Sequence, residues 1–199
     1  MTPFDALGTT EMLHILPEGA SLGASIETLL DRAFGPGRTA KTSYRYRESV
    51  DPLPHLCFTA FTDGVLTGTV RHWPLRLSGA EGSALNVALL GPIAVDPALR
   101  IGGIGGTLMR HAIAEAQRTG TDMIILVGDP AYYTRFGFRP ASDFGVMMPD
   151  ESAPRVQALP LTAQAAAMRD GGLVLPAGDL VGIATPALLR RSSSVVRAA

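Results

Sequence analysis

Residues 90–109 read LGPIAVDPALRIGGIGGTLM, and this stretch decides the fold of the chain. An apolar run closes at Asp96 and Pro97, a glycine-rich turn follows, and an amphipathic pattern begins directly after it. This order predicts a strand, a tight loop and a helix. The first N–H groups of a helix have no acceptor inside the helix and carry a partial positive charge, and glycines let a ligand approach them closely. The stretch therefore predicts a site for phosphate groups.

The spacing of the glycines narrows the choice of phosphate ligand. A dinucleotide fingerprint that starts at Gly103 needs a glycine at position 108, where the chain has Leu108. A P-loop needs a Gly-Lys-Ser/Thr sequence, and this stretch has no lysine. The pattern Arg-x-x-Gly-x-Gly, formed by Arg100, Gly103 and Gly105, resembles instead the pyrophosphate-binding motif of the GNAT superfamily of N-acetyltransferases, which bind acetyl-CoA.

A second segment strengthens this resemblance. An apolar strand pattern at 122–127 is followed by residues 128–138, GDPAYYTRFGF. The last part resembles the Tyr-x-x-x-Gly-Phe element of the family, with Tyr133, Gly137 and Phe138 at the matching positions. Two motifs in the expected order are more specific than either alone. The sequence of this segment is similar to that found in a branch of predicted bacterial acetyltransferases. The specific resemblance covers residues 85–140.

The resemblance implies an α/β fold with a mixed, mostly antiparallel sheet that is splayed at its central strands and flanked by helices. The sequence agrees, because strand and helix patterns alternate and Gly91 and Pro92 interrupt the apolar run at 85–95. A proline removes one hydrogen-bond donor from the ladder, so we expect a bulge or a splay there. We expect one domain over residues 1–185 and a flexible tail over residues 186–199.

The other elements follow from hydrophobic periodicity and turn residues. Asp63 and Gly64 predict a hairpin turn, Pro74 predicts an edge or a bulge, and Ser21 predicts an N-cap. Strands are expected at 12–16, 55–61, 65–77, 85–95, 122–127 and 156–159, and helices at 22–34, 41–48, 103–118 and 163–168.

On the resemblance, the cofactor site has two parts. The freed backbone groups of Ile93, Ala94 and Val95 are expected to pair with the pantetheine arm, and one N–H group there to stabilise the oxyanion. The pyrophosphate is expected over the loop and the helix start, where Arg100 either contacts the phosphates or positions the loop. This second set comprises Arg100, Ile101, Gly102, Gly103, Ile104, Gly105, Gly106 and Thr107.

Acetyl transfer to an amine needs a neutral amine, a polarised carbonyl and an acid for the departing thiolate. The resemblance assigns the acid to Tyr133, whose hydroxyl is protonated near neutral pH. Two alternatives stay open. Tyr133 is only a packing residue beside Phe136 and Phe138, or the adjacent Tyr132 acts instead.

The general base is harder to assign from the sequence. Asp129 is the predicted base because it lies between a strand and the two tyrosines. Its alternative role is an N-cap for a short helix that starts at Pro130. Glu48, His55 and His72 are further candidates, and a water chain to solvent is an alternative to any dedicated base.

Residues 44–47, Tyr-Arg-Tyr-Arg, form a dense group of aromatic and basic side chains. They either line an acceptor pocket and bind an acidic group of the substrate, or form a solvated helix face with one buried tyrosine.

Composition excludes several classes of protein. The 199 residues carry a formal net charge of −1, which argues against sequence-independent nucleic-acid binding. No apolar run approaches the length of about 18 residues that a transmembrane helix needs, and no secretory signal pattern is present. The single cysteine, Cys57, forms no internal disulfide, and no Cys and His cluster predicts a metal site. We expect a cytoplasmic monomer or homodimer.

Together these features predict an acetyl-CoA-dependent N-acetyltransferase that needs no metal. The expected acceptor is a primary amine of a small molecule, or of a peptide, that attacks the thioester directly. The alternative is a catalytically silent module that binds or senses acyl-CoA. A nucleotide-dependent enzyme is disfavoured by the missing lysine and the failed dinucleotide spacing.

Overall fold

The structure is a computed structural model that describes residues 12–80 and 85–177, with side chains throughout except at residues 80 and 100–102. The expected tail at 186–199 and the last part of the expected domain lie outside the described residues.

The described residues form one mixed sheet in the order β1-β2-β3-β4-β5-β8-β6, with β9 paired to β3 and β7 paired to β9. Neighbouring strands are antiparallel except β4 with β5 and β7 with β9, so the expected mixed, mostly antiparallel sheet is confirmed. The strands are β1 (Leu13–Pro17), β2 (Phe58–Thr62), β3 (Val65–Leu77), β4 (Val87–Val95), β5 (Met123–Val127), β6 (Arg139–Pro140), β7 (Val146–Met147), β8 (Val156–Pro160) and β9 (Gly172–Pro176). The α-helices are α1 (Gly23–Phe34), α2 (Thr42–Arg45), α3 (Ile104–Arg118), α4 (Pro130–Tyr133) and α5 (Ala163–Ala167).

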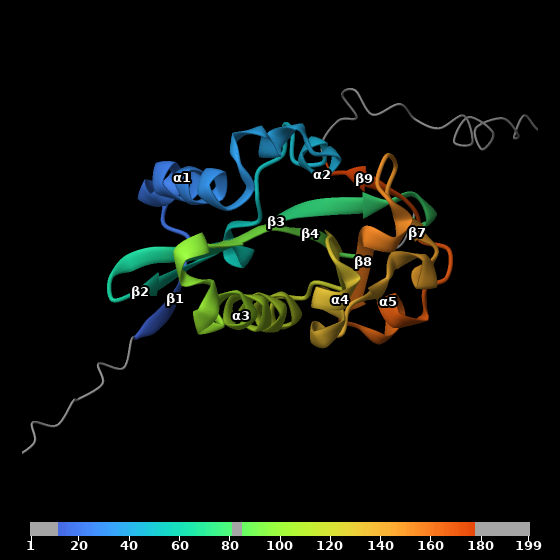
Figure 1. The fold of residues 1–199 in the computed structure, drawn as a ribbon. Coiled ribbons are helices and arrows are strands. Elements are labelled where there is room, and N and C mark those ends of the chain that lie inside the picture. Colours follow the sequence, from blue (N-terminus) through green and yellow to red (C-terminus); the bar gives the residue numbers. More distant parts are fainter. Residues whose placement is uncertain (1–11, 81–84, 178–199) are drawn as a thin grey trace, which may run out of the picture.

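Helices flank the sheet on both faces, with α1 and α2 on one side and α3 on the other (Figure 1). The apolar stripe of α3 packs on β2, β3 and β4, where Leu108, Met109 and Ala112 are fully buried. Gly68 of β3 lies directly beneath this helix, because a Cβ atom at that position would be 2.8 Å from Leu108 Cδ1. This close contact fixes the start of α3 beside the end of β4.

The two central strands separate halfway along their length. The parallel register of β4 and β5 ends at the pair Leu89 and Ile125, after which β4 stays paired with β3 and β5 stays paired with β8. The expected splay is therefore confirmed, and it begins at Leu90, two residues before Pro92.

A bulge in β4 accompanies the split. Gly91 and Pro92 together stand opposite the single residue Arg71 of β3. The extra residue inverts the alternation of side chains along the strand. Leu90 packs with the α3 cluster, whereas Ala94, four residues further on, packs with α1 on the other face.

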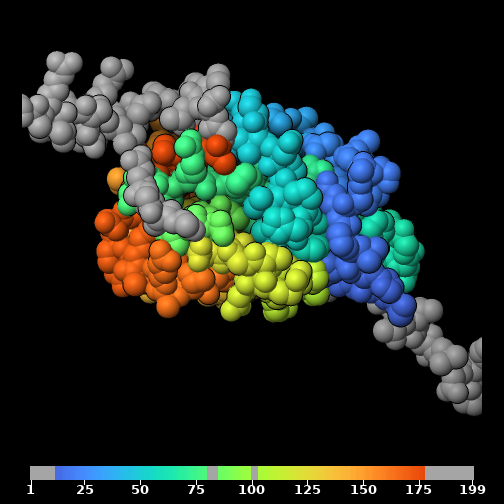
Figure 2. Space-filling view, turned by 180° about the vertical axis from the view of Figure 1, so that it is seen from behind, coloured from blue at the N-terminus to red at the C-terminus, as the bar shows by residue number. Residues whose placement is uncertain are grey.

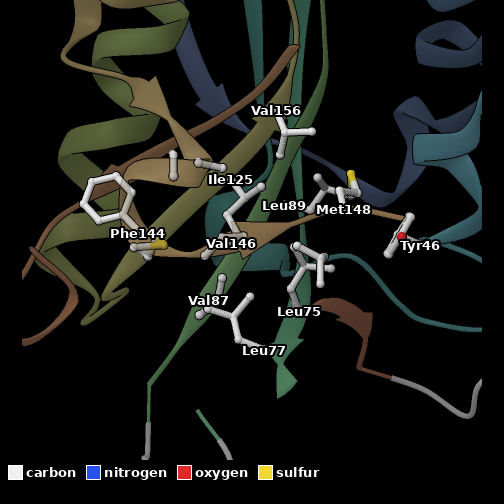
Figure 3. Packing of buried hydrophobic residues seen from close by; sticks show 14 of the residues in the cluster. Tyr46, Leu75, Leu77, Val87, Leu89, Ile125, Phe144, Val146, Met148 and Val156 are labelled. Atoms are coloured by element: carbon white, nitrogen blue, oxygen red, sulfur yellow. The ribbon is translucent and has the colours of Figure 1, made fainter. Parts of the chain in front are cut away.

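The C-terminal segments cover the half of the sheet that lies before the split. Figure 3 shows Leu89 and Ile125 of the central strands among Phe144, Val146 and Met148. The N-terminal and C-terminal elements thus occupy opposite ends of the molecule (Figure 2), and the split between β4 and β5 lies between them.

Most expected elements are confirmed with shifted ends. Asp63 and Gly64 have positive φ values of 49° and 78°, as a tight hairpin turn requires. The prediction for Ser21 is wrong, because it lies in a 3-10 turn (Ala20–Leu22) and Leu22 is the N-cap of α1. The helix expected at 41–48 is only the single turn of α2. The strands β6, β7 and β9 have no counterpart among the expected elements.

Candidate active site

Two adjacent pockets open where β4 and β5 separate. The first, with a volume of about 540 Å³, is called the strand-gap pocket. The second, with a volume of about 580 Å³, is called the helix-end pocket. The strand-gap pocket is lined by Phe34, Arg38, Lys41, Thr42, Ser43, Tyr44, Arg47, Leu89, Leu90, Gly91, Pro92, Ile93, Leu126, Val127, Gly128, Asp129, Tyr132, Tyr133, Glu151 and Arg155. The helix-end pocket is lined by Ala33, Phe34, Ile93, Ala94, Val95, Gly103, Gly105, Gly106, Thr107, Arg110, Tyr132, Tyr133, Arg135 and Phe136.

The helix-end pocket is built around the first turn of α3. Gly103 has the left-handed conformation, with a φ of 71°, and its carbonyl oxygen accepts the N–H of Thr107 at 3.1 Å. The N–H groups of residues 104–106 come before that bond and have no acceptor inside the helix. A Cβ atom on Gly105 would lie 3.4 Å from both the Tyr132 hydroxyl and Val95 Cγ2. A glycine here therefore keeps the backbone accessible to a ligand.

Two further arginines, Arg110 and Arg135, line the helix-end pocket, and neither was among the predicted site residues. The Arg135 guanidinium lies over the Tyr132 ring at 4.3 Å and donates from Nε to the Tyr132 carbonyl oxygen at 2.9 Å. Arg110 lies one helical turn after Gly106, on the same side of α3. No aspartate or glutamate is among the described residues that line this pocket, so its charged side chains are all positive. The i, i+4 spacing from Gly106 is a sequence signal that points to Arg110.

The structure brings most of the predicted cofactor residues to this pocket. Ile93, Ala94, Val95, Gly103, Gly105, Gly106 and Thr107 line it. The Ile104 side chain is instead buried in the α3 cluster, which leaves only its backbone for the predicted role. Residues 100–102 end a 3-10 segment (Pro97–Gly102), and the side chain of Arg100 lies outside the described part of the chain, so its role stays a prediction.

Tyr133 lies in the wall that the two pockets share, together with Phe34, Ile93 and Tyr132. Its ring rests on Gly128, where a Cβ atom would lie 2.0 Å from Tyr133 Cε2. The ring also packs edge-on against Phe138 at 6.0 Å between centroids. Burial raises the pKa of Tyr133 to about 12, so the hydroxyl is protonated at neutral pH. Tyr133 is thus both a packing residue and a pocket residue.

The predicted base Asp129 lines the strand-gap pocket and also caps α4. Its Oδ1 accepts the backbone N–H of Ala131 at 3.0 Å, so the alternative N-cap role is confirmed. A second carboxylate, Glu151, lines the same pocket. It comes from a loop far along the chain, and no local sequence pattern points to it.

The other candidate bases lie elsewhere. Glu48 and His55 are exposed and line neither pocket. His72 is fully buried on β3, with Nδ1 2.7 Å from the carbonyl oxygen of Leu56, and burial lowers the pKa of its imidazole to about 4. These positions separate all three side chains from the pockets.

The aromatic and basic group at 44–47 does line the strand-gap pocket. Tyr44 accepts a hydrogen bond from Arg38 Nη1 at 2.9 Å, and the Arg47 guanidinium lies over the Tyr44 ring at 4.3 Å. Tyr46 is buried on the other side, in the cluster shown in Figure 3. One part of each alternative is therefore confirmed: Tyr44 and Arg47 line a pocket, and Tyr46 is the buried tyrosine. Binding of an acidic substrate group stays a prediction.

Among the described residues, no three His, Cys, Asp or Glu side chains form a group that could hold a metal ion. In the same residues, no helix has both the length and the apolar character that crossing a membrane requires.

Comparison with known proteins identifies the family. A model of the acetyltransferase (GNAT) domain matches residues 24–141. Two uncharacterised N-acetyltransferases of Escherichia coli K12 are similar. YjhQ is 30% identical over 127 residues, which are 63% of this chain and 70% of YjhQ. YhbS is 31% identical over 118 residues, which are 59% of this chain and 68% of YhbS.

Solved structures agree with the sequence matches. The crystal structure of Escherichia coli YhbS in complex with CoA has a TM-score of 0.72 and 26% identity, and the match covers 83% of this chain and 90% of YhbS. The structure of a GNAT family acetyltransferase from Brucella melitensis in complex with acetyl-CoA has a TM-score of 0.57 and 26% identity. The match covers 76% of this chain and 90% of the Brucella protein. Fold and family matches define the class of enzyme as an acyltransferase. The family match spans more than half of the chain, which therefore belongs to the GNAT acetyltransferase family.

Proposed function

We propose that this acyltransferase moves the acetyl group of acetyl-CoA to a primary amine of a small molecule or peptide, which attacks the thioester directly. The observation that carries the proposal is the wall shared by the two pockets. A pocket with free helix N–H groups and arginines meets a second pocket of small-molecule size at Ile93, Tyr132 and Tyr133. A donor and an acceptor bound in these two pockets meet at that wall.

The residues of the helix-end pocket fit the phosphates of CoA. The N–H groups of residues 104–106 and the guanidinium groups of Arg110 and Arg135 supply donors and positive charge, and Gly105 leaves the backbone open. The CoA-bound and acetyl-CoA-bound structures of similar proteins support the choice of ligand.

The residues at the split fit the reacting end of the cofactor. Beyond Leu89 the edge of β4 that faces β5 is unpaired in the described structure, so residues 93–95 have backbone groups available for the pantetheine arm. An N–H group of this segment is the proposed donor to the oxyanion.

Tyr133 is the proposed acid. When the amine nitrogen has attacked the carbonyl carbon and the C–S bond breaks, the Tyr133 hydroxyl donates its proton to the thiolate sulfur. The Tyr133 hydroxyl carries its proton at neutral pH, which a general acid requires, and the departing thiolate supplies the negative charge that draws the proton across.

The amine must lose a proton before or during attack. Asp129 is the proposed acceptor of this proton, because it follows β5 at the edge of the strand-gap pocket. Glu151 is the second carboxylate of that pocket, and it performs this role if Asp129 serves only as a cap.

The decisive experiment is an acceptor screen that detects release of the free CoA thiol from acetyl-CoA. An acetyltransferase releases thiol and forms the acetylated amine in equal amounts. Tight binding of acetyl-CoA by calorimetry without amine-dependent thiol release, over a broad panel of amines, would favour the silent binding module.

A further inference from the structure

Arg47 is a half-buried cation at the wall of the strand-gap pocket. Its guanidinium lies over the ring of Tyr44, at 4.3 Å, and over the ring of Trp73, at 5.0 Å. Its Nε and Nη1 atoms are buried and have no hydrogen-bond partner among the described residues. Nη2 lies beside the bulge, where a Cβ atom on Gly91 would be 3.4 Å away.

The neighbouring buried arginine has a different environment. Arg38 pairs with Asp31 and Glu27 and donates to the Tyr44 hydroxyl. Asp31 and Glu27 are therefore engaged by Arg38, and Tyr44 is the side chain that opposes the desolvation of Arg47. Buried guanidinium nitrogens without a hydrogen-bond partner are unfavourable for folding, so their presence at a pocket wall points to a ligand of opposite charge.

We propose that Arg47 binds a carboxylate of the acceptor, so that the substrate is an amine that also carries a carboxylate group, such as an amino acid or a short peptide. This inference rests on the proposed function and specifies its substrate class. Two aromatic rings lie against the guanidinium and its Nε and Nη1 atoms are buried, so Nη2 is the nitrogen that a ligand in the pocket reaches first. A guanidinium N–H donor forms a strong charge-assisted hydrogen bond with a carboxylate oxygen.

The position of Arg47 also suits the orientation of such a substrate. Gly91 has no side chain and so leaves room on the β4 side of the split. Asp129, the proposed proton acceptor, follows β5 on the other side. Arg47 and Asp129 line the same pocket, so a substrate that carries both an amine and a carboxylate offers one group to each side of it. Burial lowers the pKa of Arg47 to about 10, so it remains charged at neutral pH.

The test uses amine acceptors in matched pairs, each as the free carboxylate and as the corresponding carboxamide. We expect kcat/KM for thiol release to favour the carboxylate by at least about tenfold, since a charge-assisted hydrogen bond is roughly twice as strong as a neutral one. In Arg47→Met, which keeps an apolar side chain against the two rings, this preference should fall to near one. Arg47→Lys should keep part of it, because it retains the charge but not the planar guanidinium.

The ratio of kcat/KM for the carboxylate to kcat/KM for the carboxamide does not depend on how much of the variant protein is folded. Arg45→Met is the matched control two residues away, since Arg45 pairs with Asp150 and does not line the pocket, and it should keep the full preference. Lys41→Met tests the other cation of this segment that lines the pocket. Equal rates for acids and amides, an unchanged ratio in Arg47→Met, or a preference lost only in Lys41→Met would each overturn the proposal and leave the acetyltransferase function intact.

A binding experiment decides the same question without turnover. N-acetyl amino acids and their amides, titrated into the CoA-saturated protein, should show the same preference and the same loss in Arg47→Met. If no amine is acetylated, the proposed function fails, and this titration still supports or rejects the carboxylate site.

Discussion

The helix-end pocket and the strand-gap pocket differ in how the sequence builds them. The helix-end pocket takes most of its wall from residues 93–110 and 132–136, and exposed backbone is a large part of it. The strand-gap pocket takes side chains from segments spread between Phe34 and Arg155. Backbone recognition needs glycines at fixed local positions, whereas side-chain recognition needs the folded chain. The first pocket is therefore suited to a ligand common to the family, and the second to a substrate specific to this protein.

The largest expected effect is on CoA affinity and comes from a substitution in the helix-end pocket. Gly105→Asp should weaken CoA binding by at least about 100-fold, because like charges about 4 Å apart repel by roughly 4 kcal/mol at an effective dielectric constant near 20. Gly105→Ala is the control, since its Cβ would meet Tyr132 and Val95 at 3.4 Å and add no charge. Calorimetry with CoA measures both, and undiminished affinity in the aspartate variant would locate the phosphates elsewhere.

The next effect tests the wall between the pockets. Tyr133→Phe should lower kcat by about 100-fold, the lower end of a general-acid contribution, because it keeps the ring and removes the proton. Its affinity for CoA should change little, since the hydroxyl acts mainly as charge develops on sulfur. Tyr132→Phe is the matched control, and a large loss only in that variant would move the acid one residue upstream.

A smaller effect sharpens the chemistry of the strand-gap pocket. Asp129→Asn should lower kcat by about tenfold, less than a fully buried base supplies, because Asp129 is exposed. Asparagine caps a helix as well as aspartate, so α4 should be unaffected. Glu151→Gln is the comparison. A loss in Glu151→Gln with none in Asp129→Asn would reassign the proton acceptor.

The last effect concerns stability and involves neither pocket. The pKa of His72 falls from 6.5 to about 4 on folding, so between these values the unfolded chain binds a proton that the folded chain does not. The free energy of unfolding should therefore decrease as the pH falls below 6.5, by about 2 kcal/mol near pH 5. Urea unfolding of the parent and of His72→Gln at about pH 7 and pH 5 measures the difference. An identical pH dependence in both would show that His72 does not contribute.

Local signals explain which parts could be predicted from sequence. The sequence predicts the long strand β3 with the ends that the structure has, Val65 and Leu77, because alternation and a hairpin turn bound it. It does not predict β9, because pairing with the distant strands β3 and β7 defines that strand. Likewise the glycine loop reveals one pocket, whereas Glu151 joins the other pocket through a tertiary contact that no spacing encodes.

The bulge in β4 determines which face of the sheet each later side chain of the strand points to. Because Gly91 and Pro92 share one position opposite Arg71, the alternation of side chains between the two faces of the sheet reverses at the bulge. Deleting Pro92 would remove the bulge and restore a regular alternation of side chains. Every side chain on one side of the deletion would then point to the opposite face of the sheet. Ala94 would then face α3 instead of α1, and Ile93 would leave the shared wall of the pockets. In β4 an insertion or deletion of one residue is therefore expected to change the structure more than a substitution does, as a frameshift changes a coding sequence more than a point mutation does.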